Sequence, residues 1–556
     1  MKVVRCLLAE SRTLFAVGIV ASIISGVAAM GVIVILFHIV GGSRESQTQW
    51  GWFVGLAVVA VAARTVSRRL IAHLGRETLF RIRVTLARQI VEAPLLVLEQ
   101  TGNARLLASL TEDVTRVAGT LPNLVLLTTN TTLLMAFIGY LGWLSPAHLM
   151  IVVAVIAIGT AAHLALRREG TRQSRVSREK WQDMFESFRA LIGGMKEIKL
   201  NAARREQALD MFSQRASDLK ESGRRQSRFF GASATLTQAL FYVAIGLALV
   251  EFAKTDTNRI VLVGYVISII YLMAPLQAVI DILQSLVQAN IAMGRIEELG
   301  VRLDQARPRH SDEPLDSQAG WTTLQLAAVG YGYGPPEERD FALKPISLTL
   351  EAGEIVFVVG GNGSGKTTFA KIVTGLYTPT SGDIIIGGRR VGEGDHSWYR
   401  QQFSAIFHDS FLFEHLPPIG AKGPNCDSEV SELLQKLQIA DRVKIEDGRL
   451  SNTAALSLGE RKRVALMLAY FEDRPICLFD EWAADQDSIF KDVFYREILS
   501  ELRSRGKLVI VISHDDRYFD VADKLLVLER GLPPLVKRGG AAGDTIGASE
   551  ALARSA

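Results

Sequence analysis

Residues 13–40 form one long apolar segment, TLFAVGIVASIISGVAAMGVIVILFHIV, and this segment limits the fold more than any other feature of the chain. It exceeds the roughly 20 residues that a helix needs to cross a bilayer. A secretory signal would have a shorter apolar core and a cleavage site of small residues, so we interpret the segment as a retained membrane helix. The sequence therefore predicts a membrane protein.

Five further apolar segments are candidates for membrane helices. The six predicted spans are about 13–40, 51–72, 119–143, 146–166, 229–252 and 260–286. The second is the weakest, because Arg64, Arg68 and Arg69 crowd its end. A count of six is still favoured over five, since it puts both long connecting loops on one side. An apolar fraction of 48% agrees with a chain that is partly embedded in a membrane.

The two long loops, about 73–118 and 167–228, are rich in arginine, whereas the short loops between the spans carry few basic residues. The positive-inside rule places the long loops and both termini in the cytoplasm. The sequence MKEIKLNAARREQALDMFSQRASDLK has helical periodicity with charge pairs four residues apart. We therefore expect the membrane helices to continue as long rods that transmit movement, although soluble connectors would have similar composition.

The chain changes character after residue 300. A polar segment at 301–320 contains Pro308 and Pro314 and is typical of a linker. From 321 to 556, strand-like and helical runs alternate, which predicts an α/β domain. The expected fold is thus a six-helix membrane domain, 1–300, fused to a C-terminal α/β domain. A net charge of +4 gives no indication of nucleic acid binding, and three scattered cysteines exclude a disulfide framework.

The strongest motif is EIVFVVGGNGSGKTTFAKIVTGL, in which a strand at 354–359 leads into Gly360-x-x-x-x-Gly365-Lys366-Thr367 and then a helix. Glycines let such a loop direct its N–H groups at phosphate oxygens, and the helix N-terminus favours the anion. Lys366 is expected to reach the β- and γ-phosphates, and the Thr367 hydroxyl to bind Mg²⁺. The motif predicts a P-loop domain that binds ATP with Mg²⁺.

A second buried strand, PICLFDE at 475–481, ends in two acids. Next to a phosphate loop, Asp480 would be a ligand of Mg²⁺, and Glu481 would orient and polarise the water that attacks the γ-phosphate. Two acids after an apolar run are common by themselves. The interpretation depends on the phosphate loop upstream.

The segment between these motifs contains LSLGE at 456–460, which resembles the LSGGQ signature of the ATP-binding cassette (ABC) family. The resemblance implies that Ser457 and Gly459 close over the γ-phosphate held by a second subunit. Leu458 and Glu460 depart from the signature. The resemblance also assigns nucleotide contacts to the phosphate loop, namely Gly360, Asn362, Gly363, Ser364, Gly365, Lys366, Thr367 and Thr368.

Other family positions match unevenly. VGYGY resembles the segment whose aromatic ring stacks on adenine, which implicates Tyr333, although an ordinary strand tyrosine would look the same. His514 matches the family's switch histidine at the γ-phosphate, and Asp487 matches its inter-subunit aspartate. His408 stands where most of the family has a glutamine that contacts the γ-phosphate and the membrane domain; we treat it as a coupling residue and a candidate metal ligand.

Six spans with one nucleotide domain make half of the usual ABC complement, so the resemblance implies a homodimer with two shared ATP sites. The layout resembles bacterial ABC exporters of the inner membrane. FEDRPICLFDEWAADQD and VISHDDRYF resemble the cyclic-peptide and siderophore-peptide exporters, including the pyoverdine and syringomycin types. The implied cargo is a peptide-type metabolite. Trp482, Ala483 and Ala484 replace the family's usual PTS, and the segment WAAD has no chemistry that the sequence identifies.

Alternatives remain at this level. A lipid or lipopeptide flippase, or a siderophore importer, would share the architecture, whereas six apolar spans argue against a DNA-organising ATPase of the same superfamily. The membrane half says little about cargo. Asp281 is an ionisable group within a predicted span, and such groups are candidates for a cargo cavity.

Overall fold

The computed structural model describes most of the chain, with gaps at both ends and in several connections. The described residues are 5, 11–40, 46–144, 146–254, 259–305, 321–333, 342–392, 394–413, 426–443, 445–446, 449–450 and 456–538. Most of the predicted linker, 306–320, lies outside them.

The chain divides into two compact units. Unit 1 comprises Met1–Ala87 and Leu107–Gly300, and unit 2 comprises Arg88–Leu106 and Val301–Ala556. A short part of the first predicted long loop therefore belongs with the C-terminal half.

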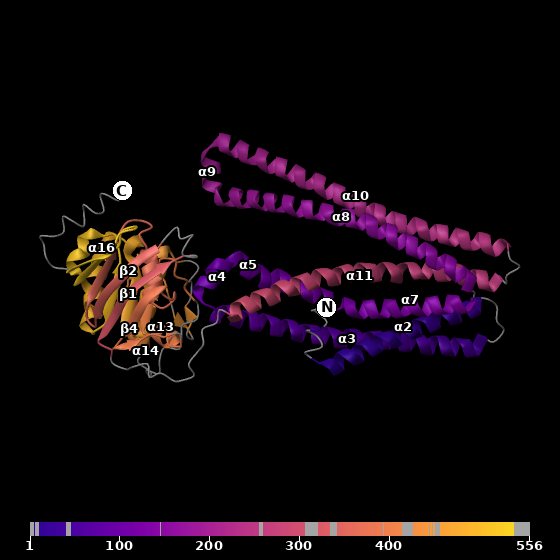
Figure 1. Cartoon of the computed structure of the whole chain (residues 1–556), viewed down its shortest axis with the longest axis horizontal. Helices are drawn as coiled ribbons and strands as arrows, with labels where there is room; N and C mark the ends of the chain where they lie inside the picture. Colours follow the sequence, from indigo (N-terminus) through magenta and orange to yellow (C-terminus); the bar gives the residue numbers. More distant parts are fainter. Residues whose placement is uncertain are drawn as a thin grey trace. The chain divides into compact units, whose positions relative to one another are not determined.

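Long helices build unit 1, and Figure 1 shows them running lengthwise beside one another. The main helices are α2 (Arg12–Val40), α3 (Ser46–Glu92), α6 (Val114–Thr120), α7 (Asn123–Leu144), α8 (Pro146–Gly193), α9 (Met195–Leu200), α10 (Ala202–Lys254) and α11 (Arg259–Gln305). Between α3 and α6 lie α4 (Leu95–Thr101), α5 (Asn103–Ala108) and the π-helix η1 (Ser109–Asp113). The helices α8 and α10 pack along each other and α9 joins them at one end. The apolar segments at 51–72, 146–166 and 229–252 continue into long helices, as expected, and a role of these helices in transmission stays a prediction.

Four segments of the described helices are long and apolar enough to cross a membrane: Arg12–Leu36, Gln49–Glu92, Asn103–Trp143 and Ile270–Gln305. The predicted spans at 146–166 and 229–252 lie in α8 and α10, which do not meet the same measure over their described residues. The count of six spans stays a prediction.

Hydroxyl groups tie the first helices of unit 1 together. The Ser22 hydroxyl on α2 donates to the Val125 carbonyl of α7 at 2.9 Å. Ser25 donates to the Ala60 carbonyl at 2.9 Å, and Ser67 on α3 donates back to the Gly18 carbonyl at 2.6 Å. Small polar residues of this kind hold helices together where water is absent.

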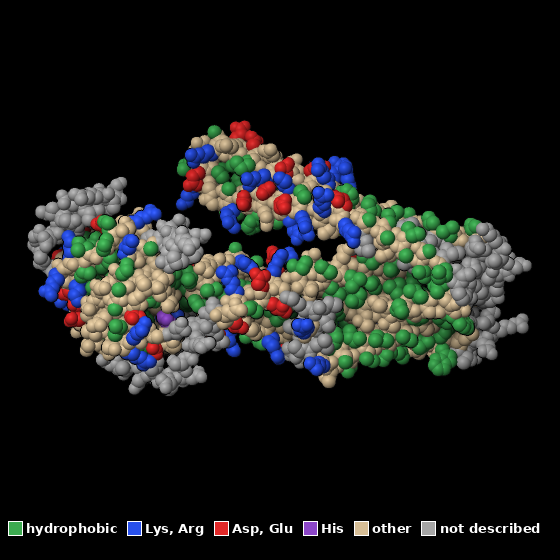
Figure 2. All heavy atoms as spheres, viewed as in Figure 1, with side chains coloured by type: hydrophobic (Ala, Val, Ile, Leu, Met, Phe, Trp, Pro, Cys, Tyr) green, Lys and Arg blue, Asp and Glu red, His purple; other side chains and the backbone are tan. Residues whose placement is uncertain are grey.

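The α8–α10 pair is apolar toward one end and charged near α9, as Figure 2 shows in green and in blue and red. Near α9, Lys180 lies 3.7 Å from Asp218, and Arg215 donates to the Asp183 carbonyl at 2.7 Å. Phe188 and Phe212 pack edge to face between the two helices, with ring centres 5.2 Å apart. Contacts of both kinds thus join α8 to α10 in their charged part.

Unit 2 is built on two sheets. A six-stranded sheet has the order β12-β11-β3-β10-β9-β6, parallel except for the edge strand β12, and a four-stranded antiparallel sheet has the order β2-β1-β4-β5. The strands are β1 (Thr323–Gly332), β2 (Ala342–Glu351), β3 (Ile355–Val359), β4 (Ser381–Ile386), β5 (Arg389–Arg390), β6 (Phe403–Ile406), β9 (Ile476–Asp480), β10 (Leu508–Ile512), β11 (Lys524–Val527) and β12 (Leu535–Arg538), with a small separate pair β7 (Ile445–Glu446) and β8 (Arg449–Leu450).

Helices complete unit 2. They are α12 (Lys366–Val373), α13 (His396–Arg400), α14 (Cys426–Lys436), α15 (Leu458–Glu472), α16 (Ser488–Asp492) and α17 (Leu499–Ser504), together with η4 (Trp482–Asp485), η5 (Val493–Ile498) and η6 (Asp516–Val521). The central strand β3 alternates between two cores: Phe357 faces one cluster, and Val356 and Val358 face the other. A parallel sheet buried on both faces is typical of an α/β domain, so the predicted fold class is confirmed.

Candidate functional site: a phosphate loop beside two acids

The phosphate loop follows β3, a strand whose five residues are all buried. A side chain at Gly360 would place its Cβ 2.1 Å from the Leu528 carbonyl oxygen, so only glycine fits where the chain leaves the sheet. The helix α12 then begins at Lys366 without a side-chain cap. Its first N–H groups are therefore available to an anion.

Lys366 is buried at the start of α12, and its ammonium donates to the Gly360 carbonyl at 2.9 Å and the Gly361 carbonyl at 3.1 Å. Burial lowers the pKa of Lys366, while the nearby carboxylates of Glu481 and Asp480 oppose the change. A buried cation that donates to two loop carbonyls is well placed to receive a phosphate group.

The other residues of the loop divide by exposure. Asn362, Gly363 and Thr367 are exposed, whereas Ser364 and Thr368 are buried. The buried hydroxyl of Ser364 has no hydrogen-bond partner among the described residues. An unpaired buried polar atom is costly, so a ligand that supplies a partner is expected here.

Asp480 ends β9, which lies between β10 and β6 in the sheet, and Glu481 follows the strand. Asp480 is 2% exposed, and its Oδ2 has no partner among the described residues. Burial raises the pKa of Asp480, and the neighbouring Glu481 carboxylate raises it further. A buried carboxylate oxygen without a donor among the described residues fits the oxygen ligands that Mg²⁺ prefers, and the exposed Thr367 hydroxyl of the phosphate loop would supply another.

Two histidines flank Glu481. His514 Nε2 lies 3.1 Å from Glu481 Oε1, and His408 Nδ1 lies 3.9 Å from Glu481 Oε2. The structure thus brings together four residues that the sequence analysis proposed from separate motifs: Asp480, Glu481, His514 and His408. A hydrogen-bonded carboxylate between imidazoles can orient a water molecule.

Tyr333 lies in an aromatic group at the end of β1. Its ring packs edge to face on Tyr331 at 5.1 Å, and its hydroxyl is 3.3 Å from the Thr368 hydroxyl in the phosphate loop helix. The side chain is 37% exposed. A partly exposed ring beside the phosphate loop can stack on a base.

Beside this group lie three residues for which the sequence predicted no role, Tyr377, Glu99 and Lys371. Tyr377 stacks on Tyr331 with ring centres 5.2 Å apart, and its hydroxyl donates to the Glu99 carboxylate on α4. Lys371 on α12 lies 2.7 Å from the same carboxylate. The only signal in the sequence is one acid in the apolar run PLLVLEQT.

The signature segment starts α15 with a reciprocal cap. The Ser457 hydroxyl accepts from the Glu460 N–H at 3.3 Å, and the Glu460 carboxylate accepts from the Ser457 N–H at 2.8 Å. A side chain at Gly459 would come within 2.8 Å of the Asp485 carbonyl oxygen. Leu458 is exposed. The two departures from the signature thus have different consequences: Glu460 fills the helix start, and Leu458 extends into solvent.

Asp487 caps α16 by accepting from the Phe490 N–H at 2.9 Å, a bond that lowers the pKa of Asp487. Arg463 on α15 also donates to Asp487 at 2.8 Å. The carboxylate therefore joins the segment after the acidic pair to the signature helix. A contact with a second subunit stays a prediction.

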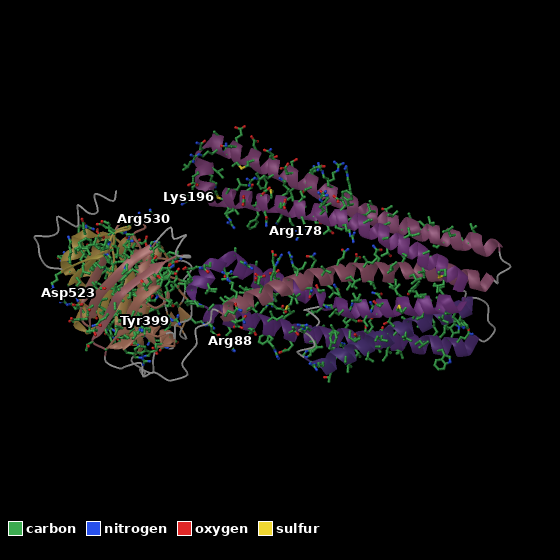
Figure 3. The ribbon with its side chains drawn as sticks, viewed as in Figure 1. Arg88, Arg178, Lys196, Tyr399, Asp523 and Arg530 are labelled. Carbon is green, nitrogen blue, oxygen red and sulfur yellow. The ribbon has the colours of Figure 1, made fainter. Side chains whose placement is uncertain are left out.

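Unit 1 contains the acid that was expected to line a cargo cavity, and that role stays a prediction. Asp281 lies on α11 with its side chain exposed. Separately, a cavity of about 480 Å³ includes Arg178, which Figure 3 labels on α8. Its lining residues are Thr171, Ser174, Ser177, Arg178, Trp181, Leu219, Gln226 and Gln288.

Comparison with known proteins agrees with this geometry. Residues 343–484 match the ABC transporter family, and residues 15–279 match the ABC transporter transmembrane region. The chain is 34% identical to the "ATP-binding protein SyrD" of Pseudomonas syringae pv. syringae, over 92% of each chain. It is 25% identical to an "ATP-dependent lipid A-core flippase" of Burkholderia orbicola, over 92% of this chain and 88% of the relative. The corresponding flippase of Cupriavidus metallidurans is 27% identical, over 86% and 82%.

The phosphate loop, the acidic strand end and the match over both halves lead to one conclusion. This chain belongs to the ABC transporters and is a bacterial half-transporter, with one membrane region and one ATP-binding domain, that couples ATP hydrolysis to export.

Proposed function

We propose that two copies of this chain form a homodimer that exports a peptide-type metabolite across the bacterial inner membrane, with the long loops and termini in the cytoplasm. The observation that carries the catalytic part is the cluster at the end of β9, where Glu481 lies between His514 and His408 next to the buried Asp480. One chain has one phosphate loop and one signature segment, so a second copy would complete two equivalent sites.

Each group at the proposed ATP site has its own role. The N–H groups at the start of α12 and the ammonium of Lys366 bind the phosphates, and Tyr333 stacks on adenine. Glu481 accepts a hydrogen bond from the attacking water and aims it at the γ-phosphate, while His514 holds the Glu481 carboxylate. Thr367 and Asp480 would hold Mg²⁺, which when bound neutralises charge on the phosphates.

Ser457 and Gly459 would contact the γ-phosphate bound by the partner chain. Closure of the two ATP-binding domains would then pull on the segments of the membrane region that reach them. Within unit 2, α4 offers such a contact, because Leu95 and Leu96 pack against the core and Glu99 binds Lys371 and Tyr377. This contact supports the transmission role that we expect for the first long loop.

The cargo class is supported by likeness to relatives. The motifs around the acidic pair resemble peptide exporters, and the SyrD chain is more similar at 34% than the two flippases at 25% and 27%. The ATP-binding domain does not contact cargo, so this support is associative. Export of lipid is the second candidate, because the flippases match over most of their length.

Proteoliposomes test the cargo directly. Vanadate-sensitive ATPase activity would be measured with a labelled cyclic lipopeptide, with a linear peptide and with lipid A, while the side on which each accumulates is recorded. We expect peptides to stimulate turnover and to accumulate on the side opposite the ATP-binding domains. Stimulation by lipid A alone would replace the peptide proposal with a flippase.

The variant Glu481→Gln tests whether Glu481 is the catalytic residue. The amide keeps the size of the side chain but loses the base, so turnover should fall by about a hundredfold or more, while ATP binding is retained. ATP turnover at the wild-type rate in this variant would remove Glu481 from its role.

A further inference from the structure

A buried lysine on the signature helix holds the backbone of the catalytic glutamate. The side chain of Lys462 is 2% exposed and lies in the second turn of α15. Its ammonium lies 2.6 Å from Asp485 Oδ2 and donates to the Glu481 carbonyl oxygen at 2.9 Å. The ammonium therefore donates one of its three hydrogens to a residue that the proposed mechanism uses.

A second bond runs in the opposite direction. The Trp482 Nε1–H donates to the Lys462 carbonyl at 2.8 Å. Trp482 is 1% exposed and stacks on Phe494 with ring centres 4.2 Å apart. The segment that the sequence analysis left without a role, Trp482–Asp485, is thus the part of the chain that clamps α15 to the end of β9.

The backbone of Glu481 needs such a clamp. Its φ of 49° lies in the left-handed region, which is unfavourable for a residue with a side chain. Strained conformations of this kind persist only where the surroundings hold them from several sides. Here the Glu481 N–H donates to the Ile512 carbonyl at 3.0 Å, and Lys462 binds the carbonyl. The direction of the Glu481 side chain follows from this backbone conformation.

We propose that Lys462 is a positioning residue for hydrolysis, which ties the signature helix to the catalytic glutamate. The inference rests on the proposed role of Glu481. Since α15 begins at the signature segment, the bond links the element expected to contact one ATP to the carboxylate that serves the other.

A purely structural ion pair would also be buried, so the test must separate the pair from the bond to Glu481. Removing one partner of a buried pair leaves an unpaired charge, whereas replacing both by apolar groups is often tolerated. Lys462→Met with Asp485→Ala removes both charges and the donor to Glu481. Asp485→Asn alone removes the negative charge but keeps an oxygen that can accept from the Lys462 ammonium, and it leaves the donor to Glu481 in place.

In full-length protein in proteoliposomes, we expect the double variant to lose about tenfold in kcat, the size of effect that a misplaced catalytic group produces. Its KM for ATP should stay within about twofold, because Lys462 does not contact the nucleotide in this assignment. The Asp485→Asn variant should keep kcat within about threefold. A wild-type kcat in the double variant, or an equal loss in both, would overturn the proposal.

Trp482→Phe covers the case in which the double variant does not fold. It keeps the stacking on Phe494 but removes the bond to the Lys462 carbonyl, so kcat should fall about threefold at unchanged KM. An unchanged kcat in this folded variant would also overturn the proposal. Absence of stimulation by peptide in the wild type would contradict the proposed cargo but would leave these kcat ratios as they are.

Discussion

Two helices of unit 2 begin where the proposed mechanism expects phosphate oxygens, and they begin differently. The helix α12 starts after Gly365 without a side-chain cap and with the buried Lys366 at its first position. The helix α15 starts with a complete capping box, formed by Ser457 and Glu460 within its own chain.

The two helix N-termini should therefore interact differently with a phosphate anion. The uncapped N–H groups of α12 and its lysine form a site that is ready for phosphate. In α15 the Glu460 carboxylate already accepts from the Ser457 N–H, and this bond lowers the pKa of Glu460, so the group stays charged. A partner's γ-phosphate would meet a negative charge there. Arg442, 3.2 Å from Glu460, partly offsets it.

The largest effect is expected from the helix that is ready for phosphate. Lys366→Ala removes the only side-chain cation described at the start of α12, and we expect ATPase activity to fall at least about a hundredfold, as on loss of a preorganised donor to developing charge. Nucleotide binding should weaken as well, measured with a fluorescent ATP analogue. Thermal unfolding of the variant at the wild-type temperature is the control for folding.

Mixing variants then tests whether the two helices belong to one site in different chains. Ser457→Arg should block the signature in its own chain, so each variant alone is inactive. A mixed dimer of Lys366→Ala and Ser457→Arg chains would contain one site with both helices intact, and activity should return on mixing. If no activity returns from demonstrated mixed dimers, the shared-site arrangement is wrong.

A smaller effect of opposite sign is expected at α15. Glu460→Gln keeps an acceptor for the Ser457 N–H, so the capping box survives and the melting temperature should change by no more than about 2 °C. Loss of the negative charge should lower the KM for ATP about threefold at low salt, and less at high salt because exposed charges are screened. An unchanged KM at low salt would mean that the Glu460 charge does not weaken the interaction of the α15 N-terminus with phosphate.

The smallest effect concerns the far end of α12. Glu99→Gln weakens the tie between α4 and Lys371, a charge pair at 2.7 Å, but keeps an acceptor for Tyr377. Such partly exposed pairs contribute up to about 1 kcal/mol. We expect basal ATPase activity to be unchanged and the stimulation by cargo to fall about twofold. Gln100→Ala, an exposed neighbour on the same helix, is the matched control, and equal behaviour of both variants would contradict a coupling role for Glu99.

Much of the fold follows from local pattern. The long apolar runs and the charged helical periodicity predicted the rods α3, α8 and α10, because both signals repeat every few residues. The strand, loop and helix around Lys366 were predicted for the same reason, and the structure places Asp480 at the end of the strand β9 as expected. Parallel strands bring their carboxyl ends to one edge, so His514 after β10 also lies beside Glu481.

The contacts that were missed join residues far apart in the chain. Glu99 and Lys371 are separated by 272 positions, and neither has a pattern that points to the other. In the sequence ERKRVA, the pattern around Lys462 is that of a charged surface residue. In the structure Lys462 is buried against Asp485.

Local patterns in the sequence were enough to find four of the apolar segments, the phosphate loop and the acidic strand end, since each pattern has its own chemistry. Which distant groups come into contact could be read only from the folded chain: Lys462 with Glu481, and Glu99 with Tyr377. The physical reason is that burial makes a charge depend on its partners, and partners are chosen by packing rather than by position in the chain.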